Sequence, residues 1–111
     1  MRVFIIALTA SILLQPSAGR ADGYPTVDRA DYVFGCMASN GQSRQILEQC
    51  SCSIDVIASI LPYPKYVEAD AILSLRQVGG EKGSVFRTSA RMKETVADLR
   101  RAQAEAEIRC F

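Results

Sequence analysis

The chain has 111 residues, with 13 basic and 12 acidic side chains and a formal net charge of +1. This balance excludes the clustered excess of lysine and arginine that is typical of nucleic-acid-binding domains. Histidine is absent, which excludes Ser-His-Asp and Cys-His catalysis and imidazole metal sites from this chain. We therefore expect a protein that is not an enzyme, holds no cofactor and has no nucleic-acid partner.

Residues 1–21 have the layout of a secretory signal peptide. Arg2 supplies a short positive region, and residues 3–14 form an apolar run broken only by two hydroxyl side chains. A run of about 12 residues is shorter than the roughly 20 that a membrane-spanning helix needs. Two small residues, the second of them Ala21, suit the −3 and −1 positions of signal peptidase, so we expect cleavage before Asp22. The expected location is the periplasm or the exterior, with no stable membrane anchor after cleavage.

The expected mature chain, residues 22–111, forms one domain. It is 90 residues long, and without the two arginines of the signal peptide it carries 11 basic and 12 acidic residues, a net charge of −1. A domain of this size buries a limited core and often needs covalent cross-links. The charge balance therefore indicates no particular class of partner, and the cysteines become the informative residues.

Two helices are predicted in the first half of the mature chain. Residues 22–26 are expected to be a loose polar lead, and Asp28 is the expected N-cap of a first helix over residues 29–38. Ser43 is the expected N-cap of a second helix that ends near Leu61, because a Pro-Tyr-Pro segment follows. The second helix is apolar around most of its circumference, which predicts that it lies at the centre of the fold.

Two more helices are predicted in the second half. The third runs from residue 64 or 65 to 78, and the fourth, with a heptad-like apolar repeat, from about 88 to 110. The glycine-rich residues 79–83 are expected to form an open loop, and residues 85–87 favour a β-conformation but are too few to build a sheet. The predicted fold is therefore an all-α, small four-helix domain that is cross-linked by disulfides.

The chain contains four cysteines, Cys36, Cys50, Cys52 and Cys110. An even number in a short exported chain predicts two disulfides. Residues two positions apart on a helix point about 200° away from each other, so a Cys50–Cys52 bridge is disfavoured. In a hairpin that turns near residue 41, Cys50 lies half a turn closer than Cys52 to the level of Cys36. We therefore favour Cys36–Cys50 with Cys52–Cys110, while Cys36–Cys52 with Cys50–Cys110 remains open.

The candidate functional residues fall into two groups. Tyr63, Lys65 and Tyr66 lie in a proline-rich segment, and rigid exposed aromatics of this kind anchor interfaces, so they form the expected partner surface. Our leading hypothesis is an exported accessory, binding or chaperone-like partner of another extracytoplasmic protein. The alternative is a thiol-redox or soft-metal-handling protein that uses Cys50 and Cys52. A third hypothesis is a chaperone that responds to acid through carboxylate protonation.

Overall fold

The computed structural model describes residues 23–111, and the expected signal peptide lies outside this range. The described chain contains helices and no strands: α1 (Thr26–Asn40), α2 (Arg44–Ile60), α3 (Tyr63–Leu75), α4 (Gly80–Thr88) and α5 (Ala90–Cys110). The all-α fold predicted from the sequence is confirmed, with five helices in this range where four were expected. None of these helices is long and apolar enough to cross a bilayer.

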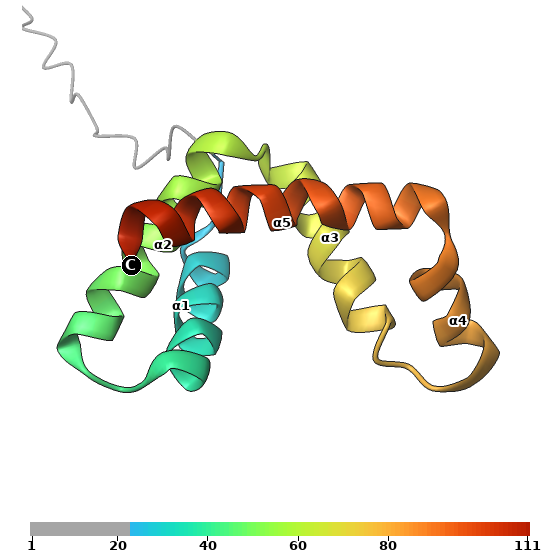
Figure 1. Ribbon diagram of the computed structural model, residues 1–111, viewed down its shortest axis with the longest axis horizontal. Coiled ribbons are helices and arrows are strands. Elements are labelled where there is room, and N and C mark those ends of the chain that lie inside the picture. The colour runs from blue at the N-terminus through green and yellow to red at the C-terminus, as the bar shows by residue number, and fades with distance from the viewer. Residues whose placement is uncertain (1–22) are drawn as a thin grey trace, which may run out of the picture.

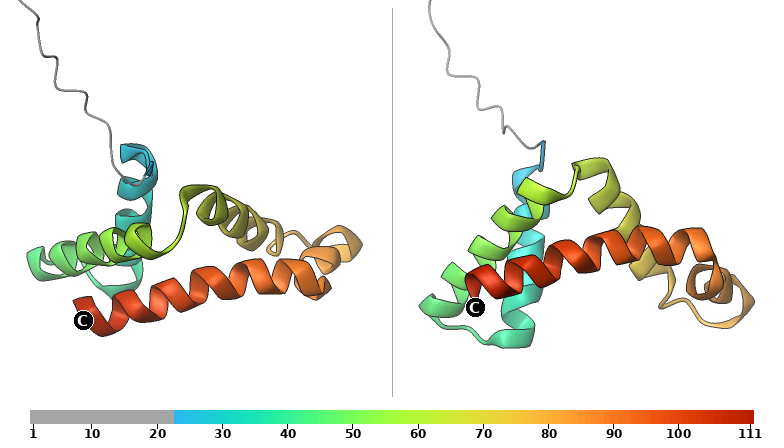
Figure 2. Two further views of the ribbon diagram at one scale, coloured as in Figure 1. Left: turned by 90° about the horizontal axis from the view of Figure 1, so that it is seen from above. Right: turned by 45° about the horizontal axis from the view of Figure 1, so that its top comes forward.

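The helices form two hairpins bridged by the long helix α5 (Figure 1). One hairpin consists of α1 and α2, and the other of α3 and α4. Helix α5 runs along both and brings the C-terminus back to the first hairpin, as the further views confirm (Figure 2). It packs against α2, α3 and α4, whereas α1 packs against α2. Helix α2 therefore lies between α1 and α5, in the central position that its apolar surface predicted.

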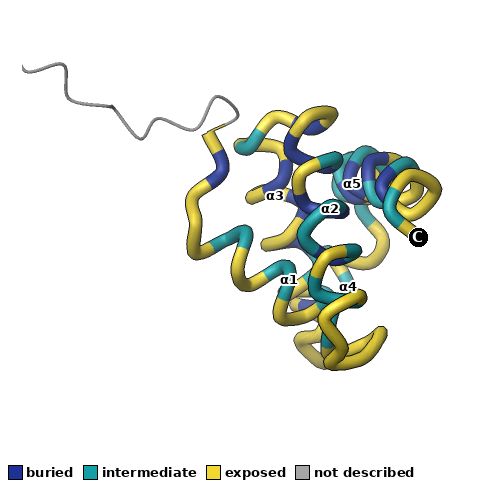
Figure 3. The backbone as a smooth tube through the Cα atoms, turned by 90° about the vertical axis from the view of Figure 1, so that its left-hand side faces the viewer, coloured by how far each residue is buried: buried dark blue, intermediate teal, exposed yellow. Residues whose placement is uncertain are grey.

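The core lies where α2, α3 and α5 meet. Its buried cluster comprises Tyr24, Ile54, Ile57, Ala58, Leu61, Tyr66, Ala69, Leu99, Ala102 and Ala106. The alanines of α5 are small, so they allow the neighbouring helices to approach closely. Figure 3 shows the buried segments along α2, α3 and α5, while α1 is exposed or intermediate along its length. Helix α1 is thus the least covered of the long helices.

We expected the lead before α1 to be loose, and this prediction was wrong. Tyr24, which lies in this segment, is fully buried. Its ring contacts those of Tyr63 and Tyr66, with centroid distances of 5.1 Å in both cases. Its hydroxyl donates a hydrogen bond of 2.7 Å to the carbonyl oxygen of Leu61, 37 residues further along the chain. The segment is therefore anchored by contacts at the α2–α3 corner that local sequence patterns do not reveal.

The helix starts differ in how well they were predicted. Helix α1 begins at Thr26 with Pro25 at the N-cap position, so Asp28 lies in the first turn and is not the cap. A carboxylate in the first turn still interacts favourably with the helix dipole. The Ser43 cap of α2 is confirmed, since its Oγ accepts a hydrogen bond of 3.2 Å from the backbone N–H of Ile46.

Helix α4 covers the segment in which we expected an open loop over residues 79–83 and a tendency toward the β-conformation over residues 85–87. The Arg87 guanidinium donates hydrogen bonds to the carbonyls of Arg76, at 3.0 Å, and Val78, at 3.1 Å, beyond the end of α3. Arg76 donates in return to a carbonyl of α4 at 2.7 Å. Gly83 approaches the Val78 carbonyl so closely that a Cβ there would lie 1.7 Å from its oxygen. Contacts with the α3 end therefore stabilise this glycine-rich helix.

Candidate functional site

Both disulfides have the connectivity that the sequence favoured. Cys36–Cys50 joins α1 to α2, and Cys52–Cys110 joins α2 to the end of α5, each with a Cα–Cα distance of 5.8 Å. No cysteine is free. Cys50 and Cys52 are each bonded to a cysteine of a different helix, so in this state they offer no thiolate pair. In residues 23–111, no cluster of three or more cysteine, aspartate or glutamate side chains is arranged to hold a metal ion.

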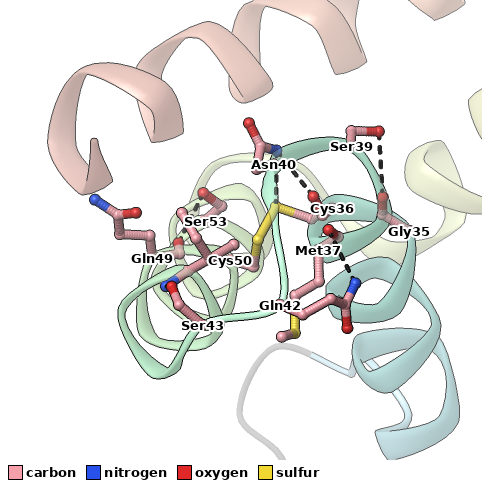
Figure 4. Close-up of a disulfide and its surroundings, with 11 residues drawn as sticks. Gly35, Cys36, Met37, Ser39, Asn40, Gln42, Ser43, Gln49, Cys50 and Ser53 are labelled. Atoms are coloured by element: carbon pink, nitrogen blue, oxygen red, sulfur yellow. Dashed lines mark hydrogen bonds between the residues drawn. A yellow bond between two sulfur atoms is a disulfide. The ribbon is translucent and has the colours of Figure 1, made fainter.

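Hydrogen bonds rigidify the closed end of the α1–α2 hairpin around the first bridge (Figure 4). The Asn40 side-chain amide donates to the carbonyl of Cys36 at 2.8 Å and lies 3.8 Å from its sulfur. The carbonyl of Met37 accepts from the backbone N–H of Gly41 at 2.8 Å and from the Gln42 side chain at 3.2 Å. The carbonyls of Cys36 and Met37 thereby receive donors from the last residue of α1 and from the turn that follows it, which ties this turn to the end of the helix.

A groove of about 480 Å³ runs along this hairpin. We call it the α1–α2 groove; it is lined by Thr26, Arg29, Ala30, Val33, Phe34 and Met37 of α1 and by Ser51, Ile54 and Asp55 of α2. Its wall is mainly apolar. Near the start of α1 the groove ends at an ion pair in which Arg29 lies 2.5 Å from Asp55. The groove thus combines an apolar surface with one charged end.

Phe34 is the most unusual residue of the groove, because 77% of it is exposed to solvent. It lies on a helix that contains no buried residue. A large exposed aromatic beside an apolar groove marks an interaction surface more strongly than a scattered exposed aliphatic does. The sequence contained part of this signal, since Val33 and Met37 lie on one helical face. It did not reveal that no other element of the described chain covers that face.

The predicted partner surface at the start of α3 is arranged differently from our expectation. Tyr66 is only 8% exposed and packs into the core. Tyr63 is half-buried, and its hydroxyl donates a hydrogen bond to Asp28 of α1. Lys65 is exposed and lies 3.8 Å from Asp98 of α5. The rings of both tyrosines pack against that of Tyr24. They therefore do not form an exposed aromatic patch with Lys65.

Comparisons of the chain with protein-family models, with curated proteins and with solved structures find no match. A functional proposal for this chain therefore rests on its own residues and their arrangement.

Proposed function

We propose that this chain is an exported, non-catalytic binding protein that holds an amphipathic helix of another extracytoplasmic protein in the α1–α2 groove. The observation that carries the proposal is Phe34, exposed at 77% beside an apolar wall. The two intramolecular disulfides support an oxidising compartment, the periplasm or the exterior, because thiols are kept reduced in the cytosol. The rigid hairpin supports binding, since a preorganised surface loses little entropy when a partner docks.

The dimensions of the groove suggest what its occupant looks like. Between Thr26 and Met37 it follows α1 for three turns, or about 16 Å. An antiparallel helix pair accepts a third helix when apolar side chains at three- and four-residue spacing enter the groove. The occupant we propose is therefore a helix of about three turns with one apolar face. A charged or amide side chain at one of its ends would meet the Arg29–Asp55 pair.

Site-specific photo-crosslinking tests this proposal. The photoreactive p-benzoylphenylalanine would replace Phe34, and in a separate variant Ile108, an apolar residue of α5 outside the groove with 79% exposure. Cells of the native host would be irradiated and the adducts identified by mass. We expect one discrete adduct with another extracytoplasmic protein from position 34 and none from position 108. The same adducts from both positions, or none, would contradict the proposal, and so would an adduct consisting of two copies of this chain.

A second variant separates binding from folding. Phe34→Ser removes an exposed side chain, so the free energy of unfolding should change by no more than about 0.5 kcal/mol. If Phe34 is an interface hot spot worth about 2 kcal/mol, affinity for the captured protein should fall about 30-fold. Unchanged affinity would exclude Phe34 as the anchor of the interface.

A further inference from the structure

The two members of the ion pair at the charged end of the α1–α2 groove differ in how much solvent reaches them. The Arg29 side chain is 20% exposed, whereas the Asp55 side chain is 71% exposed. The Arg29 guanidinium also lies over the Tyr24 ring, with its central carbon 5.8 Å from the ring centroid. An occupant of the groove would therefore meet the carboxylate of this pair more readily than the guanidinium.

The Asp55 carboxylate has room for a second donor. Arg29 donates to its Oδ1 at 2.5 Å, and within residues 23–111 its Oδ2 accepts no hydrogen bond. An ionised carboxylate offers about four lone-pair sites over its two oxygens. A lysine or arginine side chain on an occupant would therefore form a charge-assisted hydrogen bond to Oδ2 without displacing Arg29.

The charge of the whole hairpin has the same sign as this exposed group. Residues 26–60, which span α1 and α2, contain four acidic and two basic side chains, a net charge of −2. Both basic side chains already lie in ion pairs with carboxylates of the same hairpin. The other two acidic side chains, Asp28 and Asp31, belong to α1, a helix about 10–12 Å across. The Debye length is about 30 Å at about 0.01 M salt, so at low salt their charges also act on an occupant of the groove.

We propose that the α1–α2 groove selects a basic amphipathic helix of the partner protein, with a lysine or arginine at the end that lies beside Asp55. This inference rests on the proposed function, because it assigns a charge to the helix that the groove is proposed to hold. Apart from Arg29 and Asp55, every side chain that lines the groove is neutral. A glutamate on the occupant would lie beside Asp55 and meet a hairpin of its own sign. Charge complementarity of this kind excludes wrong partners more than it adds affinity.

An NMR titration of the disulfide-bonded chain with two designed peptides tests this selection. Both probes are helices of about 14 residues, held helical by a lactam on the outer face, with the same leucines at three- and four-residue spacing. One probe carries a lysine at each end of the leucine stripe and the other a glutamate, so either direction of the helix presents the same charge to Asp55. At low salt we expect saturable shifts at residues 26–37 and 51–55 with the lysine probe. Its binding should be about fivefold tighter, because it gains one exposed ion pair and avoids one contact between like charges.

Two variants and a salt series separate the charge of Asp55 from other effects. Asp55→Asn keeps an oxygen that accepts from Arg29 but removes the charge, so the preference for the lysine probe should fall to about twofold. Glu94→Gln, which removes an exposed carboxylate of α5 outside the groove, should leave the preference unchanged. Raising the salt to about 1 M, where the Debye length is about 3 Å, should weaken the preference of the unmodified chain. The salt series needs no substitution, so it tests the charge effect even if Asp55→Asn does not fold.

The possible failures are distinguishable. Equal affinity for the two probes, tighter binding of the glutamate probe, or a preference that neither salt nor Asp55→Asn weakens would overturn the charge selection and leave the groove as a binding site. An equal loss of preference in Glu94→Gln would overturn the role of Asp55. Saturable shifts at the groove residues with neither probe would contradict the groove itself, and with it both proposals.

Discussion

Tyr24 anchors the segment before α1, so its truncation should strongly destabilise the fold. It is fully buried, lies against the rings of Tyr63 and Tyr66, and donates a hydrogen bond to the Leu61 carbonyl. Truncation of a buried aromatic to alanine costs about 3–5 kcal/mol. Tyr24→Phe keeps the ring but leaves the Leu61 carbonyl without this donor, so we expect a loss of about 1–3 kcal/mol.

Equilibrium urea unfolding, followed by helical circular dichroism with both disulfides closed, measures these losses. Val27→Ala is the matched control, because Val27 lies three residues away and is 72% exposed. Its effect should stay within about 0.5 kcal/mol. A Tyr24→Ala variant as stable as the Val27→Ala variant would refute the docking of the N-terminal segment. It would also remove the support for the inward packing of the α3 tyrosines.

Three further predictions concern other parts of the fold. Replacing both Cys52 and Cys110 by alanine should lower the free energy of unfolding in urea by about 4 kcal/mol, because the bridged residues are 58 positions apart. Replacing Cys36 and Cys50, which are 14 positions apart, should lower it by about 3 kcal/mol, and equal losses would contradict this difference. Gly83→Ala should lower the free energy of unfolding by about 1–3 kcal/mol, because the added Cβ clashes with the chain that follows α3. Gly35→Ala is the control and should be neutral or stabilising, because a Cβ there meets open space, and a neutral Gly83→Ala would show that α4 is not packed as described. Asp70→Asn should raise the free energy of unfolding at pH 7, because the raised pKa of Asp70 means that its ionised carboxylate destabilises the folded state. The gain should vanish as the pH falls below 3.8, where the carboxyl is protonated in both the folded and the unfolded chain, and a gain that persists at low pH would refute this origin.

The features that the sequence predicted correctly depend on local periodicity and on short spacings. The Cys36–Cys50 disulfide could be predicted because the 3.6-residue helical period and a hairpin turn between the two helices place these cysteines at similar levels. The Ser43 cap needs only a hydroxyl three residues before a free N–H. The end of α2 before Pro62 follows from the lost donor and the restricted backbone of proline.

The features that the sequence did not reveal depend on contacts between distant segments. Tyr24 is buried by residues some 37 positions away, and no property of its immediate neighbours indicates this. Helix α4 needs the Arg87 side chain to reach carbonyls near the end of α3. A glycine-rich segment with low helix propensity therefore forms a helix because tertiary contacts override that propensity.

The α1–α2 groove and a hollow between α1 and α3 were missed for a related reason. An apolar stripe on a helix predicts burial, but the pattern alone does not say which stripe remains uncovered after folding. The apolar spacing of Val33 and Met37 in the sequence is the same as that of a stripe that faces the core, yet in the structure these residues line an open groove. Likewise, Asp70 lies far along the chain from Asp28 and Asp31, and the three line one hollow only because the first part of α3 lies near the first part of α1.

The central claim, an exported chain cross-linked by two specific disulfides, is tested most directly by intact mass and non-reducing peptide mapping of the protein from its native host. We predict a chain in the extracytoplasmic fraction that begins at Asp22 and is about 4 Da lighter than its reduced form, two hydrogens for each bridge. Its linked peptides should join Cys36 to Cys50 and Cys52 to Cys110. A chain that retains Met1 and carries free thiols in the cytosolic fraction would contradict the account.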